Sequence, residues 1–181
     1  MKIIGFVNRI GEEREASGEW EMLLKGDSCL LNGRKPFFLP DWSDEIGVTP
    51  CVILRVSRLG KDIAPKFASR YYDAVAPGLD FVALDILREA RQAGKPWTRA
   101  TGFDFSLAIG EWMKTDEGAN GLTGEGLMSP EQAISEASKV MTIRQGDLIY
   151  IQSKCAPRKV QKEEIIRVET DGEEKLYCKI K

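Results

Sequence analysis

The sequence predicts an α+β fold in which strands dominate and about three helices are interspersed. Three observations support this prediction. Runs of strand length, several rich in β-branched residues, recur along the chain, three segments show helical periodicity, and Asn-Gly or Asp-Gly pairs mark turns between strands. The length of 181 residues is that of one domain, so we expect a single domain over residues 1–181.

Strands are predicted first near the N-terminus. Residues 2–7 (KIIGFV) and 21–31 (EMLLKGDSCLL) have strand character, and the polar stretch between them predicts a mobile loop over residues 11–19. The pair Asn32-Gly33 is typical of a turn, after which residues 35–39 return as a strand that ends at a proline.

The remaining strands lie in the middle and at the end of the chain. Residues 50–57 (PCVILRVS) are apolar nearly throughout, which indicates a strand inside the sheet. Three further strands are predicted in the C-terminal part, and the Asp171-Gly172 turn joins the last two of them. These strands cover residues 147–152, 165–169 and 175–181.

Three segments have helical patterns. Apolar residues spaced i, i+3, i+4, i+7 predict a helix over residues 64–75, with Asp62 as its cap and Pro77-Gly78 after its end. A second helix is predicted over residues 80–93. A third opens with Ser129, Pro130 and Gln132, the residue types of a capping box with proline at the first helical position, and is expected to run to residue 139. The glycine-rich polar segment 114–126 predicts a mobile loop.

Composition excludes several classes of protein. Hydrophobic residues make up 43% and charged residues 30% of the chain, and the formal net charge is −2, so no electrostatic footprint for nucleic acid or an anionic membrane is present. No apolar run approaches the length that spans a bilayer, and the first residues lack the pattern of a secretory signal. We therefore expect a cytoplasmic protein.

The chain contains four cysteines and no histidine. No two cysteines form a Cys-x-x-Cys pair, so a structural zinc site is not indicated and buried free thiols are expected at Cys29, Cys51, Cys155 and Cys178. The absence of histidine removes the usual near-neutral general base. Acid–base chemistry would therefore need carboxylates, lysine or tyrosine with shifted pKa values, or metal-bound water.

Several segments carry a family resemblance, and they occur in the same order along the chain as in that family. They are the opening strand, residues 23–43 (LLKGDSCLLNGRKPFFLPDWS), 55–63 (RVSRLGKDI), 70–86 (RYYDAVAPGLDFVALDI), 95–112 and 141–152 (MTIRQGDLIYIQ). Together they resemble the C-terminal catalytic domain of the fumarylacetoacetate hydrolase superfamily. The resemblance implies a mixed β-roll or β-sandwich with peripheral helices, usually assembled as a homodimer. It also implies a divalent-metal enzyme that hydrolyses, decarboxylates or isomerises 2-oxo acids.

The resemblance places a metal site at three positions, of which one keeps its carboxylate. Family members hold Mg²⁺ or Mn²⁺ with a Glu-x-Glu pair on one strand face and an aspartate. Here Thr49 and Cys51 stand at the glutamate positions, and Asp80 matches the aspartate. Asp80 also lies at a predicted helix start, where we favour an N-cap over a metal ligand. The resemblance therefore implies a degenerate metal site and no bound cofactor, or Mg²⁺ or Mn²⁺ if activity remains.

The substrate-binding positions of the family are also changed. Thr101 stands where the resemblance implies a catalytic lysine, and Arg99 lies close enough in sequence to supply a positive charge instead. The family's substrate loop is replaced by a segment in which Ser153 and Lys154 are candidates to hold an anion. The histidine of the family's His–Glu lid pair has no counterpart here. Glutamates in the corresponding N-terminal region are Glu12, Glu13 and Glu15.

Two functions follow from these substitutions. The first is a pseudoenzyme, a family member that has lost the metal site and serves as a binding module for a small 2-oxo acid or as a partner subunit. An inert subunit pairing with an intact relative cannot be separated from it by sequence. The alternative is an active divalent-metal-dependent hydrolase, decarboxylase or isomerase acting on a 2-oxo or diketo acid. Its metal shell would join Asp80 with Cys51 or with acids from Asp44, Glu45, Asp85 and Glu111.

Overall fold

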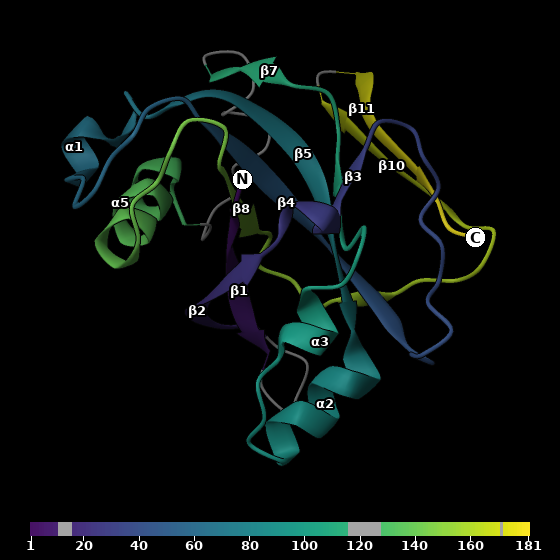
Figure 1. Ribbon diagram of the computed structural model, residues 1–181. Helices are drawn as coiled ribbons and strands as arrows, with labels where there is room; N and C mark the ends of the chain where they lie inside the picture. The colour runs from purple at the N-terminus through teal and green to yellow at the C-terminus, as the bar shows by residue number, and fades with distance from the viewer. Residues whose placement is uncertain (11–15, 116–127, 171) are drawn as a thin grey trace.

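A mixed sheet carries most of the chain in the computed structural model, which describes residues 1–10, 16–115, 128–170 and 172–181 (Figure 1). Strands β1 and β8 pair in parallel, as do β3 and β6, and the other pairs are antiparallel. Over the described residues the main path of the sheet runs through β2 (Ala16–Lys25), β1 (Ile3–Ile10), β8 (Leu148–Gln152), β4 (Ile46–Val56), β5 (Tyr72–Ala83), β6 (Leu107–Ile109) and β3 (Leu30–Asn32).

Four further strands complete the described β-structure. Strand β7 (Met113–Lys114) pairs with β5, and β9 (Arg158–Lys159) pairs with β4. Strands β10 (Ile165–Thr170) and β11 (Glu173–Lys179) form a separate antiparallel pair. A bridge between Phe37 and Ile180 connects the segment after β3 with the residues that follow β11.

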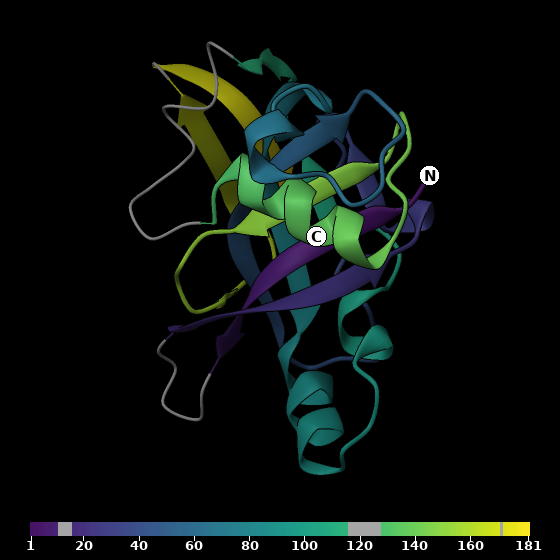
Figure 2. The same cartoon turned by 90° about the vertical axis from the view of Figure 1, so that its left-hand side faces the viewer.

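Helices lie at the margins of the main sheet. Helix α5 (Pro130–Val140) packs against the short α1 (Pro65–Ala68) on one side, away from the β10–β11 pair (Figure 2). Helix α2 (Leu84–Gln92) and the short α3 (Thr98–Thr101) lie together beyond the end of β5 (Figure 1). A 3-10 turn, η1 (Asp27–Cys29), connects β2 with β3. The predicted strand-dominated α+β architecture with peripheral helices is therefore confirmed.

The core has three large apolar parts, one of which surrounds Ile53 and Tyr150 in the main sheet, while the other two lie toward α5 and toward β10 and β11. The buried face of α5 contributes Ala133, Ile134 and Ala137 to the part that contains Ile4 and Leu54 from the sheet. The centre of the part toward β10 and β11 is a parallel stack of the Phe37 and Phe81 rings with centroids 4.0 Å apart. No described helix is long and apolar enough to cross a bilayer.

The capping signal predicted the third helix correctly. The backbone N–H of Gln132 donates to Ser129 Oγ (3.2 Å), and the backbone N–H of Ser129 donates to Gln132 Oε1 (3.1 Å). Strand predictions near β1, β4, β8, β10 and β11 are also confirmed. In contrast, the predicted strand 35–39 makes only the bridge at Phe37, and the predicted strand 21–31 is interrupted by η1.

The helix predicted over residues 64–75 is wrong. Helix α1 ends at Ala68, and the following residues enter β5, which lies between β4 and β6 and is buried from Ala74 onward. A central strand is apolar on both faces, and such a run also satisfies helical spacing. Gly78, expected to end the helix, instead belongs to β5, where a Cβ would approach Ile53 Cδ1 to 2.5 Å.

The helix predicted from residue 80 begins four residues later, at Leu84. Asp80 is therefore a strand residue, and its interpretation as a helix N-cap is wrong. The two predicted mobile loops lie partly outside the described residues, including Glu12, Glu13 and Glu15. Where the structure describes them, residues 16–19 belong to β2 and Lys114 to β7. Of the four free cysteines, Cys155 is exposed rather than buried.

Candidate functional site

A buried ion pair joins the end of β2 to the centre of β5. Lys25 Nζ lies 2.6 Å from Asp80 Oδ1, and the two side chains are 0% and 4% exposed. The same ammonium donates to the backbone oxygen (3.1 Å) and to the Oγ (3.0 Å) of Ser106. All three N–H groups of Lys25 therefore have acceptors, as a buried ammonium requires.

The second oxygen of Asp80 is bound by β8. Gln152 Nε2 donates to Asp80 Oδ2 (2.6 Å), and Gln152 Oε1 accepts from the backbone N–H of Asn8 (3.1 Å). Asn8 Nδ2 in turn donates to the backbone oxygen of Ser153 (2.7 Å). A continuous polar network thus links β1, β2, β5 and β8 inside the sheet. We call Asn8, Lys25, Asp80, Ser106 and Gln152 the Lys25–Asp80 network.

Strand register explains why these side chains meet. Asp80 pairs with Thr49 across β4 and β5, and Cys51 pairs both with Gly78 on β5 and with Gln152 on β8. Paired residues share a sheet face, as do residues two apart on one strand. Thr49, Cys51, Asp80 and Gln152 therefore lie on one face, so the three predicted metal-ligand positions are neighbours.

Apart from Lys25, the side chains around Asp80 are neutral. Burial, followed by the negative charge of Asp80, raises the pKa of the Cys51 thiol well above its ordinary value. Burial and the same carboxylate also raise the pKa of the Tyr150 hydroxyl. The Thr49 Oγ1 atom is buried, with no hydrogen-bond partner among the described residues. Asp80 and Lys25 are therefore the opposite charges around which the network is built.

Two of the four carboxylates proposed to rebuild a metal shell with Asp80, namely Asp85 and Glu45, have other partners. Asp85 accepts from Ser43 Oγ (2.7 Å) and the backbone N–H of Asp44 (2.9 Å). These bonds outweigh the opposing effect of burial and lower the pKa of Asp85. Glu45 forms an ion pair with Arg88 (2.5 Å), whose hydrogen bond lowers the pKa of that carboxyl. No group of three His, Cys, Asp or Glu side chains suited to a metal ion occurs in the described part of the chain.

The predicted substrate residues lie around the network rather than in it. Thr101 ends α3, its hydroxyl donates to the backbone oxygen of Trp97 (3.1 Å), and its own backbone oxygen accepts from Ser106 Oγ (3.1 Å). Arg99 is exposed, with its guanidinium 5.8 Å from the Trp42 ring centroid. Ser153 contacts Asn8 through its backbone, and Lys154 is exposed. Substrate binding by Arg99, Ser153 and Lys154 stays a prediction.

Sequence reasoning identified Asp80 and missed the other members of the network, of which Lys25 and Gln152 bind the Asp80 carboxylate directly. Lys25 follows the apolar run Met22–Leu24. A lysine at the end of a strand is usually exposed to solvent, so its burial was not expected. Gln152 ends β8, in the segment where the family's substrate loop is replaced by other residues. Its burial becomes apparent only once β8 is known to lie between β1 and β4.

A sequence model described as the C-terminal domain of fumarylacetoacetate (FAA) hydrolase matches residues 5–124, which are 120 of the 181 residues. The chain belongs to the fumarylacetoacetate hydrolase (FAH) family. The predicted family resemblance is thereby confirmed, and β2, β4 and β5, the strands that carry Lys25, Thr49 and Asp80, lie within the matched range.

Curated relatives of this FAH-family chain include two proteins named oxaloacetate tautomerase FAHD1, mitochondrial. The Arabidopsis thaliana protein is 26% identical over 145 residues, which cover 71% of this chain and 65% of the relative. The mouse protein is 25% identical over 177 residues, which cover 88% of this chain and 80% of the relative. The chain thus spans somewhat under two thirds of the plant relative's length.

Solved structures share the fold of this FAH-family chain. Fumarylpyruvate hydrolase from Pseudomonas aeruginosa, determined in complex with Mn²⁺ and pyruvate, superposes with a TM-score of 0.81 at 18% identity. The match covers 99% of this chain and 88% of that chain. At this level of identity the likeness shows the fold alone, and the site has to be judged from its own residues.

Proposed function

We propose that this chain is a catalytically degenerate member of the FAH family, a pseudoenzyme that acts as a binding module or partner subunit. The observation that carries the proposal is the buried Lys25–Asp80 ion pair. It places an ammonium on the carboxylate that the resemblance assigns to the metal. The described residues at this place therefore do not fit a divalent cation, and no reaction step is derived through one.

Electrostatics supports the proposal. Both oxygens of Asp80 already accept short hydrogen bonds, one from the Lys25 ammonium and one from the Gln152 amide. A divalent cation at Asp80 would be repelled by the ammonium, because like charges interact strongly inside a protein. Hard cations also require several oxygen ligands. Thr49 and Cys51 offer a neutral hydroxyl and a neutral thiol.

Access supports the proposal as well. The exposed fractions are 1% for Lys25, 3% for Asp80 and 7% for Gln152, and Thr49 is fully buried. A catalytic carboxylate or metal must meet its substrate at a pocket that admits it. The family site is instead filled by the protein's own side chains, so this place serves stability in our proposal, and any 2-oxo acid would bind outside it.

The alternative is an active divalent-metal-dependent hydrolase, decarboxylase or isomerase acting on a 2-oxo or diketo acid. Family membership favours it, as do the names of the FAHD1 relatives and the Mn²⁺ and pyruvate held by the Pseudomonas protein. Asp80 would be its metal ligand. For this function Lys25 would have to leave Asp80, and further oxygen ligands would have to replace it.

Manganese titration distinguishes the two functions. We expect free Mn²⁺, followed by its EPR signal, to show no sub-millimolar binding to the wild-type chain. An oxaloacetate tautomerisation and decarboxylation assay with added Mn²⁺ should give no rate above that of buffer. Sub-millimolar binding that is lost in Asp80→Asn but retained in Asp73→Asn would overturn the proposal. Asp73 is a matched control, because it is an exposed aspartate on the same strand.

The partner role has its own measurement. We propose that the chain forms a homodimer or pairs with a related FAH-family subunit. Light scattering coupled to size-exclusion chromatography gives the mass of the particle in solution. A mass of twice 20.2 kDa would support the homodimer. A monomer that also fails to bind an intact FAH-family subunit from the same source would contradict the partner role.

A further inference from the structure

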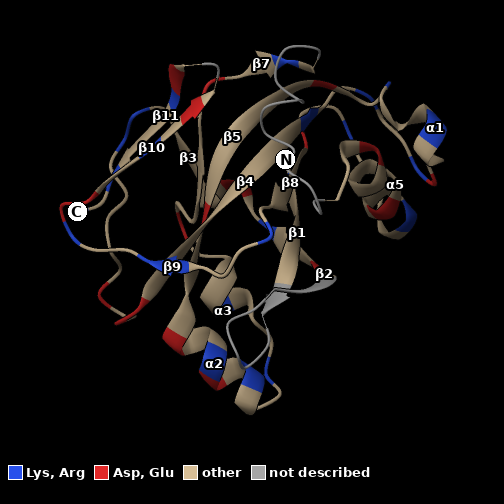
Figure 3. Cartoon of the chain, turned by 180° about the vertical axis from the view of Figure 1, so that it is seen from behind, with Lys and Arg blue, Asp and Glu red and all other residues tan. Residues whose placement is uncertain are grey.

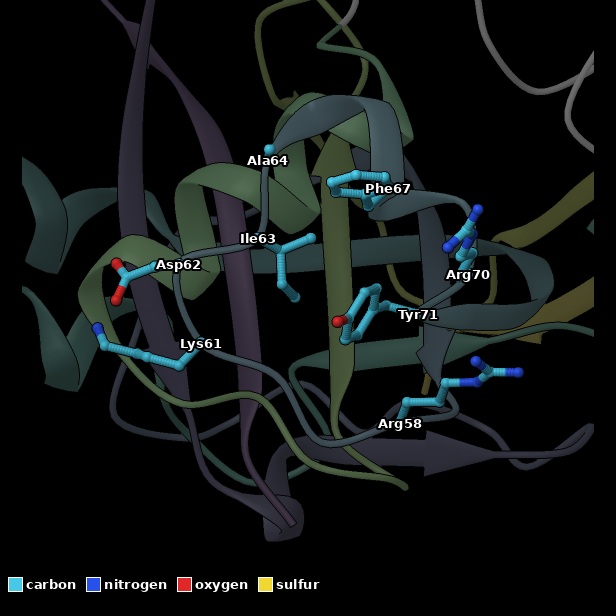
Figure 4. Close-up of a pocket in the computed structure, with 8 residues that line it drawn as sticks. All are labelled: Arg58, Lys61, Asp62, Ile63, Ala64, Phe67, Arg70 and Tyr71. Carbon is cyan, nitrogen blue, oxygen red and sulfur yellow. The ribbon is translucent and has the colours of Figure 1, made fainter.

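A second charged site lies far along the sheet from the Lys25–Asp80 network, beside α1. A cavity of about 410 Å³ opens between α1 and the segment that leads from β4 to it. Figure 4 shows Lys61 and Asp62 on one side of this space, Arg58 and Arg70 on the other, and Phe67 and Tyr71 between them. Its volume is within the range of small-molecule sites. We call these six residues the α1 pocket.

The α1 pocket is positively charged in a chain whose net charge is −2. Arg58, Lys61 and Arg70 contribute three positive charges to its lining and Asp62 one negative charge, a balance of +2. In the described part of the chain, no carboxylate forms an ion pair with Arg58 or Arg70. Figure 3 shows Lys and Arg on α1 and on the chain beside it. Two guanidinium groups are therefore available to an anion.

Aromatic rings form the apolar part of the pocket. Phe67 is 42% exposed, although it is a large apolar residue. The Arg70 guanidinium lies 5.3 Å from the centroid of that ring. In Figure 4 the Tyr71 ring stands between Ile63 and Arg58 with its hydroxyl directed into the space. A ligand that reached the arginines would therefore have a ring to pack against.

The frame of the pocket is held in place by backbone hydrogen bonds. Gly60 exchanges two bonds with Ile143, of 3.0 and 2.9 Å. The backbone N–H groups of Asp62 and Ile63 donate to the backbone oxygen (3.1 Å) and the Oγ (2.9 Å) of Ser138 on α5. Asp62 has a φ of +51°, a left-handed conformation that aspartate tolerates better than most residues other than glycine. The segment is thus fixed before any ligand arrives, which lowers the entropy cost of binding.

Gly60 and Lys61 fit this interpretation. A Cβ at Gly60 would come within 2.6 Å of the Tyr71 ring and 2.5 Å of Ile63, so only glycine lets the two side chains take these positions. Lys61 Nζ donates to the backbone oxygen of Lys139 at the end of α5 (2.6 Å). That bond holds Lys61 beside the pocket, where its charge adds to those of the arginines.

We propose that the α1 pocket binds a small organic dianion that carries an aromatic ring. The dianionic group lies between the Arg58 and Arg70 guanidinium groups, which form strong charge-assisted hydrogen bonds with phosphate or carboxylate oxygens. The ring packs on Phe67 and Tyr71. Aromatic phosphate monoesters and aromatic dicarboxylates share this chemistry. The proposal is independent of the family site, because the two share no residue.

Titration with four probes tests the proposal. Phenyl phosphate and phthalate each combine a ring with two negative charges, inorganic phosphate lacks the ring, and benzamide lacks the charge. We expect calorimetry to give a dissociation constant of about 1 mM or lower for phenyl phosphate, phthalate or both. Inorganic phosphate and benzamide should bind at least about fivefold more weakly. The better of the two dianions identifies the ligand class as a phosphate monoester or a dicarboxylate.

Variants locate the binding. Arg58→Gln and Arg70→Gln should each raise the dissociation constant of the tighter-binding dianion about tenfold, because one charge-assisted contact is lost. Arg55→Gln is the control, since its guanidinium also lies over an exposed aromatic ring, that of Trp112 at 5.3 Å, but outside the pocket. In ¹H–¹⁵N spectra the amide signals of Gly60 and Ala64 should shift on titration. The proposal is overturned if neither dianion binds with a dissociation constant below about 10 mM. Equal binding by wild type and both pocket variants would overturn it too.

Discussion

Lys25 is the residue on which the Lys25–Asp80 network depends, since its ammonium balances the one carboxylate. We expect Lys25→Met to lower the free energy of unfolding by about 3–5 kcal/mol, because it leaves Asp80 buried without a counter-charge. The double variant Lys25→Met/Asp80→Asn should recover part of this loss, since Asn keeps an acceptor for Gln152. Urea unfolding at neutral pH measures these changes.

The control for this prediction is an exposed pair on the same sheet. Arg55 and Asp73 form an ion pair whose side chains are 43% and 50% exposed, so Arg55→Met should cost less than about 1 kcal/mol. A Lys25→Met variant as stable as Arg55→Met would show that Asp80 does not need its partner.

Asp147 makes stability depend on pH. Burial opposes its ionisation, but hydrogen bonds from the Lys2 ammonium and from the backbone N–H groups of Lys2 and Arg144 prevail, and the pKa of Asp147 lies below its ordinary 3.8. A carboxyl whose pKa is lower in the folded state stabilises the fold above the unfolded-state pKa. That stabilisation is lost as the pH falls through the folded-state value.

We therefore expect Asp147→Asn to lower the free energy of unfolding by about 1–3 kcal/mol at neutral pH. The difference in free energy of unfolding between Asp147→Asn and wild type should shrink as the pH is lowered below about 4, where the aspartate takes up a proton. Urea midpoints of both proteins across this pH range provide the measurement. A stability difference that stays constant from neutral pH to about pH 2 would rule out the ionisation of Asp147 as the cause of that difference.

At the scale of elements, α5 and β5 show what the sequence can and cannot predict. The start of α5 depends on contacts within four residues, the Ser129 and Gln132 capping box, so its signal is local. Strand β5 depends on β4 and β6, and its apolar run satisfies helical and strand spacing alike. Helical periodicity was therefore a misleading guide for residues that become a central strand.

The same distinction applies to the candidate site. Thr49, Cys51 and Asp80 were predicted as neighbours, because the family resemblance carried their positions over, and strand register brings them together. The partners of Asp80 were not predicted, since Lys25 lies 55 residues and Gln152 72 residues away along the chain. Such pairings follow from strand order, which no local pattern encodes.

The capping box of α5 gives a prediction at this scale. Ser129→Ala removes the side-chain acceptor for the Gln132 N–H and should cost about 1 kcal/mol of stability. Ser135→Ala lies in the same helix and removes a buried hydroxyl that has no hydrogen-bond partner among the described residues. It should be neutral or stabilising, because alanine is the better helix former. Thermal unfolding followed by far-UV circular dichroism compares the two, and equal losses would contradict the capping argument.

At the scale of the whole molecule, the two sheets should differ in local stability. Strand β4 lies inside the main sheet, and its residues are buried apart from Pro50 and the partly exposed Arg55. Strand β10 belongs to the separate two-stranded sheet and alternates between exposed and partly buried residues up to the buried Thr170 at its end. Segments with fewer buried contacts open at lower free energy.

We expect native-state hydrogen exchange to show global protection for β1, β4 and β8 and faster, sub-global exchange for β10. Low concentrations of urea should raise the exchange rate of β4 amides and change that of β10 amides little, since opening of β10 exposes little surface. Identical exchange free energies in β4 and β10 would mean that both sheets unfold as one unit.

The parallel pairing of β1 with β8 affects the order in which the molecule is made. Residues 3–6 pair with residues 148–151, and β1 lies between β2 and β8. On the ribosome, β1 and β2 can form their hairpin early, but one edge of β1 has no partner until more than 120 further residues have been synthesised. Pairing over such a separation is slow. During that interval the β1 edge is open to other strands, so the nascent chain should need chaperone protection until β8 emerges.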